Sequence, residues 1–188
     1  MISQPVLPTG RHRGLIIQHH RMVSTGAFSY GGWKLIWHTT EGGNMTSVLN
    51  TLTQKGAQVH CVIAPEINLV EQMVPFNQYG KGLMHPQGTP ETNRAHCIQV
   101  EIIGFVKDSP HWSDHFYRNL ARLALLIEHR VPIVRANYHP FGNHVKRLSP
   151  DGFVGAVGHL GHEHVPNNDH VDPGNMDIQK LLHLMGKV

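Results

Sequence analysis

The sequence predicts a single α/β domain, in which a mixed central β-sheet is flanked by α-helices. Two observations support this fold class. Short β-like runs alternate with helical patterns along the chain, and 188 residues is the length of one domain. Hydrophobic residues make up 40% of the chain and charged residues 15%, which excludes general disorder. We expect a loop-rich N-terminal extension over residues 1–30 and the main domain over residues 31–188.

The first elements of the main domain are predicted to be a strand and a helix. The run WKLIWH at 33–38 is typical of a buried strand. In the range 45–55, apolar residues recur at i, i+3, i+4 and i+7, which predicts one buried helix face. Asn44 suits the N-cap of this helix, and Gly56 suits its C-terminal stop.

The middle of the chain is predicted to be mostly strand and loop. The range 58–64 alternates between two faces, and 69–74 suggests its hairpin partner. Residues 76–96 form a long polar loop, and loops of this length inside a compact domain are often functional. The range 97–103 is strongly β-like.

The C-terminal third is predicted to contain two more helices and one strand. Ser109-Pro110 opens a helix with a buried apolar stripe, and Pro132 ends it. A loop over 135–152 leads to a short strand at 153–157. A last amphipathic helix begins at Met176.

Composition also bears on the partners. The formal net charge of +3 is too small to argue for nucleic acid, and no apolar run is long enough to span a membrane. The N-terminus lacks the apolar core of a secretory signal. We therefore expect a monomer made in the cytoplasm, without a nucleic-acid partner and without membrane insertion. Cys61 and Cys97 lie in β-like runs, where we expect buried free thiols.

The segment 158–174 has the composition of a metal site. It holds four histidines and three carboxylates in a loop with two prolines. Imidazole nitrogen and carboxylate oxygen are zinc ligands, and catalytic zinc uses three protein ligands plus water. Two ligands could come from this segment. His38 is the best candidate for the third, because it ends an apolar strand. The alternative is a solvated histidine-rich loop.

Glu101 is unusual because it interrupts a run of β-formers at 97–103. A carboxylate there either faces a polar cavity or lies on a half-exposed strand face. In a dry cavity near a metal, its pKa would rise and it could act as a general base.

Three motifs together carry a resemblance to a known family. WHTTEG at 37–42, ETNRAHCIQVEIIG at 91–104 and GHEHVPNNDHVDPG at 161–174 resemble zinc-dependent N-acetylmuramoyl-L-alanine amidases of the amidase-2 type. This family is similar to the peptidoglycan recognition proteins, and the wording is closest to amidase domains of phage endolysins. The resemblance covers about residues 30–185.

The resemblance implies a zinc groove at the edge of the sheet. The family's ligands fall on His38, His162 and Asp172, and its strand Glu, the general base, falls on Glu101. Many relatives carry a Lys two residues before the last ligand, where this chain has His170 as a catalytic donor.

The resemblance also implies which residues surround the ligands. The loops 76–96 and 135–150 would line the groove. The expected substrate-binding residues are Asn93, Arg94 and His60. The other histidines of the late segment, His159 and His164, are expected to lie around the ligands or to face solvent.

The implied activity is hydrolysis of the amide between N-acetylmuramic acid and L-alanine in peptidoglycan, with Zn²⁺ as cofactor. A phage endolysin acting on the host cell wall and an intracellular muropeptide-recycling amidase both fit. A non-catalytic peptidoglycan-binding module is a further alternative, and a zinc peptidase of the stem peptide is another. The absence of HExxH weakens the peptidase interpretation.

Overall fold

The computed structural model describes residues 5–83, 92–135, 139–142 and 147–188. Its centre is a seven-stranded sheet in the order β1-β2-β5-β4-β6-β3-β7. The strands are β1 Gly10–His12, β2 Leu15–His19, β3 Lys34–Thr39, β4 Cys61–Ala64, β5 Leu69–Gln72, β6 Cys97–Ile102 and β7 Gly158–Gly161. The α/β fold predicted from the sequence is confirmed.

The sheet is mixed, as predicted. The strands β4, β6, β3 and β7 are parallel neighbours, and β2 is parallel to β5. The pairs β1–β2 and β4–β5 are antiparallel. The second of these is the hairpin expected after residue 58. Parallel strands place their carboxyl ends at one edge of the sheet, which is where α/β proteins bind ligands.

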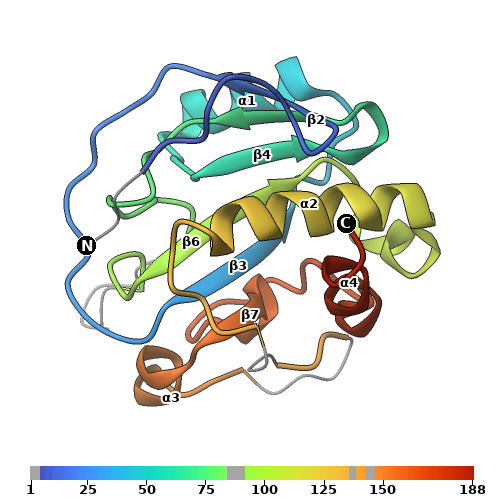
Figure 1. Ribbon diagram of the computed structural model, residues 1–188. Helices are drawn as coiled ribbons and strands as arrows, with labels where there is room; N and C mark the ends of the chain where they lie inside the picture. Colours follow the sequence, from blue (N-terminus) through green and yellow to red (C-terminus); the bar gives the residue numbers. More distant parts are fainter. Residues whose placement is uncertain (1–4, 84–91, 136–138, 143–146) are drawn as a thin grey trace.

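Four α-helices and three short 3₁₀ helices surround the sheet in the described ranges. The α-helices are α1 Met45–Lys55, α2 Asp114–Glu128, α3 Pro150–Gly155 and α4 Ile178–Met185. The 3₁₀ helices are η1 Pro65–Ile67, η2 Val106–His111 and η3 His162–His164. Figure 1 shows α2 lying across β3 and β6 on the face of the sheet nearest the viewer, with α4 beside it.

Helix α1 has the boundaries that its sequence predicts. The Asn44 side chain accepts a hydrogen bond from the Ser47 backbone N–H at 3.1 Å, which caps the first turn. Gly56 ends the helix with a φ of 66°, a left-handed conformation that glycine adopts without strain.

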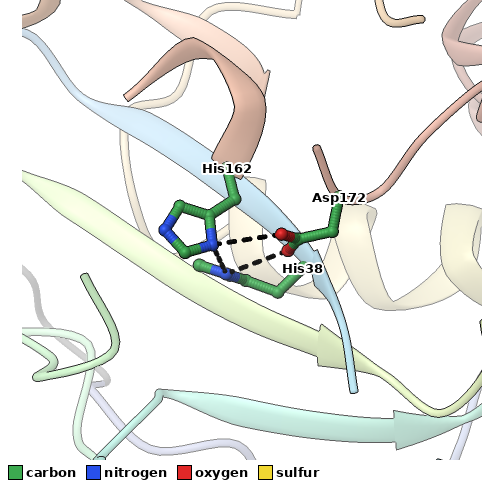
Figure 2. A group of neighbouring side chains, drawn as sticks. All are labelled: His38, His162 and Asp172. Atoms are coloured by element: carbon green, nitrogen blue, oxygen red, sulfur yellow. Dashed lines mark hydrogen bonds and ion pairs between the residues drawn. The ribbon is translucent and has the colours of Figure 1, made fainter. Parts of the chain in front are cut away.

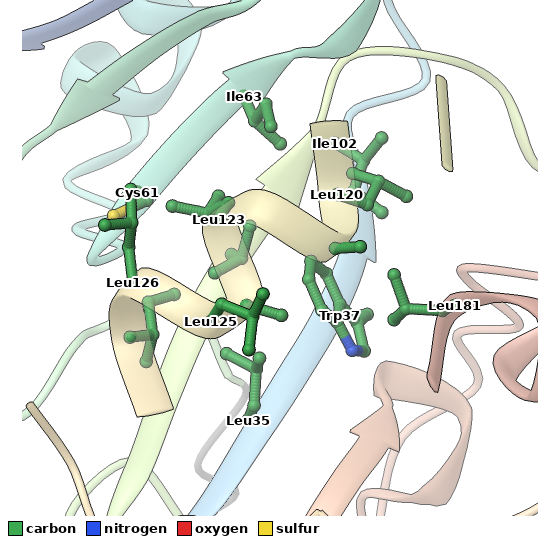
Figure 3. Close-up of a cluster of buried hydrophobic side chains, with 14 of the residues drawn as sticks. Leu35, Trp37, Cys61, Ile63, Ile102, Leu120, Leu123, Leu125, Leu126 and Leu181 are labelled. Carbon is green, nitrogen blue, oxygen red and sulfur yellow. The ribbon is translucent and has the colours of Figure 1, made fainter. Parts of the chain in front are cut away.

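The main core lies between the sheet and the pair α2 and α4. Because side chains alternate along a strand, Leu35 and Trp37 of β3 point to this core, whereas His38 points to the opposite face. Figure 3 shows Leu120, Leu123 and leucines of the following turn of α2 packed onto these strand side chains. The opposite face has two smaller apolar clusters, one under α1 and one that includes Phe153 of α3.

The segment 1–30 contributes β1 and β2 to the sheet, and a domain boundary at residue 30 stays a prediction. Two sequence-based expectations about the elements need correction. The strand expected at 153–157 is wrong. Ser149 caps α3 by accepting from the Gly152 N–H, and Pro150 opens that helix, so the strand begins only at Gly158.

The second correction concerns the long helix. Residues 106–111 form the 3₁₀ helix η2, and α2 begins at Asp114. Ser113 is its N-cap and accepts from the Phe116 N–H at 3.1 Å, which is a stronger start signal than Ser109-Pro110.

Both cysteines are buried free thiols, as predicted. Within the described ranges, the model has no helix with the length and apolar character needed to cross a membrane.

Candidate metal centre

The three predicted metal ligands come from three separate elements. His38 is near the carboxyl end of β3, and His162 follows directly after β7. Asp172 lies in the loop between η3 and α4. Since β3 and β7 are parallel neighbours, their ends bring the two histidines together at one edge of the sheet. All three residues are buried.

The donor atoms of these residues converge. The Nδ1 atoms of His38 and His162 are 3.1 Å apart. The Asp172 carboxylate oxygens lie 3.5 Å from the His38 Nδ1 and 3.3 Å from the His162 Nδ1 (Figure 2). Four ligands at zinc–ligand distances of about 2.0–2.1 Å form a tetrahedron with edges of about 3.3 Å. The observed separations therefore fit three corners of a zinc site.

The imidazole rings are not committed to other partners. The Nε2 atoms of His38 and His162 are buried and have no hydrogen-bond partner in the described part of the chain. No competing interaction therefore holds either ring away from a metal. Among the described residues, this trio is the group of three potential donors that could enclose one ion.

The charges in the trio are coupled. Burial alone would lower the pKa of His38, but its hydrogen bond to Asp172 and the charges of Glu101 and Asp172 raise it overall. Burial, with the charge of His38, lowers the pKa of His162 to about 4. Without metal, an added proton therefore favours His38 over His162.

Asp172 remains ionised in this setting. Burial alone would raise its pKa, but the hydrogen bonds with His162, His170 and His38 outweigh burial and lower the pKa far below its usual range. The Thr39 backbone N–H donates to the second carboxylate oxygen at 3.3 Å, which orients the carboxylate toward β3. An anionic ligand between two imidazoles is a donor set that suits Zn²⁺.

Glu101 lies beside the trio. It is the register partner of His38 on the adjacent strand β6, so the two side chains share one face of the sheet. Its Oε2 atom is buried and has no hydrogen-bond partner among the described residues. Burial raises the pKa of this carboxyl group, although the charge of His38 partly opposes the rise. An unpaired carboxylate of raised pKa is suited to accept a proton.

His170 completes the group. Its Nδ1 lies 3.3 Å from an Asp172 oxygen, and its ring stacks on His162 with a centroid separation of 4.1 Å. The hydrogen bond to Asp172 raises the pKa of His170. Because 46% of this side chain is exposed, it can reach a bound substrate.

A pocket of about 610 Å³ opens onto these residues. Its far wall is a polar stripe of α1 that the sequence analysis missed, formed by Ser47, Thr51 and Lys55. The signal was the i, i+4, i+8 spacing, which places these residues on one side of the helix. The charge of Lys55 slightly lowers the pKa of Glu101.

Comparisons with known proteins add evidence on the fold. No family model and no curated protein matches the sequence. Several solved structures match over nearly the whole chain, and three of them are described below. The hydrolase AmiA of Staphylococcus aureus has 14% identity and a TM-score of 0.59, over 96% of this chain and 84% of that one. A selenomethionine derivative of AmpD has 17% identity and a TM-score of 0.61, over 98% of both chains.

The third is the endolysin N-acetylmuramoyl-L-alanine amidase LysCS from Clostridium intestinale URNW. It has 13% identity and a TM-score of 0.59, over 94% of this chain and 98% of that one. The chain shares its fold with an amidase. At this level of identity the likeness concerns the fold, so the function is argued from the site itself.

The structure does not bring the expected substrate-binding residues to the pocket. The Asn93 side chain bonds both backbone groups of Leu83 at 3.0 Å. Arg94 packs over the Tyr79 ring, 4.6 Å from its centroid. His60 is fully buried: its Nδ1 accepts from the Gln99 N–H, and its Nε2 donates to a backbone carbonyl. Their role in substrate binding stays a prediction. Parts of the two groove loops, 84–91, 136–138 and 143–146, lie outside the described residues.

Of the two positions expected for His159 and His164, the structure excludes exposure to solvent, because both side chains are buried. His159 is buried between Trp37, whose ring N–H it accepts at 3.2 Å, and Glu128, to which it donates at 3.0 Å. His164 accepts from the Gly161 N–H and donates to the Pro140 carbonyl. Both rings therefore use their two nitrogen atoms in hydrogen bonds within the fold. Neither ring is one of the candidate metal ligands.

Proposed function

We propose that this chain is a zinc-dependent N-acetylmuramoyl-L-alanine amidase that cleaves the amide between N-acetylmuramic acid and L-alanine in peptidoglycan. The observation that carries the proposal is the convergence of two imidazole nitrogens and a carboxylate at zinc-like spacings, beside Glu101, whose buried Oε2 atom has no partner among the described residues. The fold shared with LysCS supports the choice of this amide among possible hydrolytic substrates.

His38, His162 and Asp172 would hold the metal. Zinc in such a site supplies a Lewis acid and lowers the pKa of water to about 7. The chain's own residues perform the proton transfers. Glu101 accepts the proton of the attacking water, which its raised pKa favours. The same carboxyl group then returns the proton to the departing nitrogen of L-alanine.

His170 is placed to stabilise the negative charge that develops on the carbonyl oxygen. Its contact with Asp172 favours the protonated ring, so it can donate a charge-assisted hydrogen bond. The stack on His162 and the hydrogen bond from Arg147 to the His170 carbonyl hold its position.

A purely binding role is less well supported than catalysis. A module that only binds peptidoglycan needs neither a complete set of metal donors nor an unpaired carboxylate next to them, and a buried unpaired carboxylate is costly. We further propose the endolysin role, with synthesis in the cytoplasm and action on the host wall. The rival recycling role predicts a preference for soluble muropeptides over intact sacculi, and parallel digestion of both substrates compares the two roles.

The test of the reaction uses purified sacculi and the zinc-loaded protein, with mass spectrometry of the new ends. We expect free L-alanine amino groups at the start of the stem peptides. Glu101→Gln should keep zinc and lower turnover by about 10²–10⁴-fold. Glu66→Gln, an exposed carboxylate outside this pocket, is the matched control and should be unchanged.

Two results would reject this function. New ends only inside the stem peptide would make the chain a peptidase. Binding of sacculi without any product would make it a recognition module.

A further inference from the structure

A row of side chains crosses the sheet on the face that carries the metal centre. The strand registers pair Gln18 with Glu71, Glu71 with Val62, Val62 with Glu101, and Glu101 with His38. Register partners on neighbouring strands point to the same face of a sheet. Two carboxylates, Glu71 and Glu101, therefore stand on one face, two strands and roughly 10 Å apart.

Helix α1 lies over the middle of this row and divides it. Val48 and Leu49 of α1 pack in one apolar cluster with Val62. On one side of the helix is the metal pocket. On the other side is a second cavity of about 800 Å³, which shares no lining residue with the first. The larger of the two cavities is therefore the one without the metal ligands.

Glu71 lines the second cavity and has no partner there. The residue is 7% exposed. Within the described chain, its carboxylate makes no hydrogen bond or ion pair, although the charge of His19 acts on it from a distance. Burying an ionised carboxylate without a partner is costly. Burial accordingly raises the pKa of Glu71, an effect that His19 only partly opposes.

The residues around Glu71 indicate what kind of ligand the cavity can bind. Apolar side chains form much of the wall, and they include Met45 of α1, Leu69 of β5, Trp112 directly after η2 and Phe116 of α2. The other ionisable groups that line the cavity are two carboxylates, Glu66 and Asp108, and one imidazole, His20. The cavity is thus apolar in its walls and negative in its charge.

We propose that this second cavity binds a primary amine, in its ammonium form, carried on an apolar stem of several carbons. The ammonium pairs with the Glu71 carboxylate and the stem contacts the apolar wall. A metal ion fits less well, because Glu71 belongs to no group of three donors among the described residues that could enclose one. Such an amine can belong to a diamino acid of a cell-wall peptide or to a free diamine.

The test measures binding of 1,5-diaminopentane by calorimetry to the whole protein. Wild type should bind it, and Glu71→Gln should weaken binding roughly ten- to a hundredfold, as expected for loss of a hydrogen bond to a charged group. Asp151→Asn is the matched control and should bind like wild type, because Asp151 is exposed and lies outside the cavity. 1-Pentanol, which has the stem without the charge, should not bind measurably.

Thermal unfolding separates a binding role from a structural one. Glu71→Gln removes an unpaired buried charge and keeps the shape, so its melting temperature should equal or exceed that of wild type. A lower melting temperature, equal diamine binding by both proteins, or saturable Ca²⁺ binding lost in the variant would each overturn the proposal.

A final arm identifies the source of the amine. Native sacculi and sacculi with acetylated amines are added as competitors at 4 °C to metal-free protein. Competition by native sacculi alone assigns the amine to the wall peptide, and absence of competition assigns it to a free diamine. Both readings are independent of hydrolysis, so failure of the proposed amidase activity would not affect them.

Discussion

One face of the sheet is covered by α2 and α4 in a continuous apolar core, whereas the other carries two separate clusters under α1 and α3. The second face also carries His38, Glu101 and Glu71, each of which has a polar side-chain atom without a hydrogen-bond partner among the described residues. Incomplete cover leaves room for cavities of about 610 and 800 Å³ on that face. The comparison teaches that the stability of this fold and its chemistry are carried by opposite faces of the same strands.

The largest effect should come from removing a metal ligand on the open face. His162→Ala should abolish tightly bound zinc and measurable hydrolysis, because three protein ligands define a catalytic zinc site. Zinc content by atomic absorption and digestion of sacculi check this. His183→Ala, an exposed histidine of α4, is the control. Full retention of zinc in the first variant would move the ligand to a neighbouring histidine.

The closed face should respond in stability. Leu123 is fully buried between α2 and the sheet, so Leu123→Ala should lower the free energy of unfolding by about 2–5 kcal/mol. Urea unfolding measures the change. Thr51→Ala on the open side of α1 should change stability by less than about 0.5 kcal/mol. Equal losses of unfolding free energy in the two variants would show that the two faces contribute alike to stability.

His170 offers a test within the open face. His170→Ala should lower turnover by about 10²–10³-fold, while zinc and sacculus binding persist, because the donor acts on the transition state. His170→Lys should restore part of the activity and flatten its decline at alkaline pH, since a lysine stays protonated there. Steady-state kinetics across pH check both. Unchanged turnover in the alanine variant would leave His170 without a chemical role.

The smallest effect is a dependence of zinc affinity on pH. The pKa of His38 is raised in the metal-free protein, and a zinc ligand must be neutral, so loading should release one proton. Affinity should fall about tenfold per unit as pH drops below the His38 pKa, and level off above it. Chelator competition at several pH values measures this. A flat profile through that range would show that His38 is already neutral before zinc binds.

The same His38 pKa gives the sign of its effect on the metal-free fold. A raised pKa means that the native protein holds the proton more tightly than the unfolded chain. The resulting stabilisation is present below the unfolded value of about 6.5 and is lost as pH rises through the folded pKa. His162, with its pKa lowered to about 4, acts in the opposite direction between pH 6.5 and 4.

Local signals explain what could be predicted from the sequence. The sequence of helix α1 contains both of its end signals, and the helix begins after Asn44 and ends at Gly56 as predicted. The candidate trio could be named because His38 ends an apolar strand and the late segment holds closely spaced ligand types. Parallel pairing of β3 with β7 then brings these residues together, as a fold of this class allows.

The misses concern tertiary partners. Strand β2 pairs with β5, which lies far away along the chain, and no local pattern announces that partner. The hydrogen bonds between the Asn93 amide and the Leu83 backbone were not expected either, although the role of Asn93 in substrate binding stays a prediction. The polar stripe of α1 could be assigned to the metal pocket only from the structure, which shows which side of the helix faces that pocket.

The position of the trio along the chain has a mechanical consequence. His38 and His162 are 124 residues apart, so an ion that grips both closes most of the polypeptide into a ring. By the loop-closure entropy known for disulfides, a ring of this size disfavours the unfolded chain by about 4–5 kcal/mol. Zinc would then be a reversible cross-link as well as a catalytic group. A chelator would destabilise this chain in the way that a reductant destabilises a disulfide-bonded one.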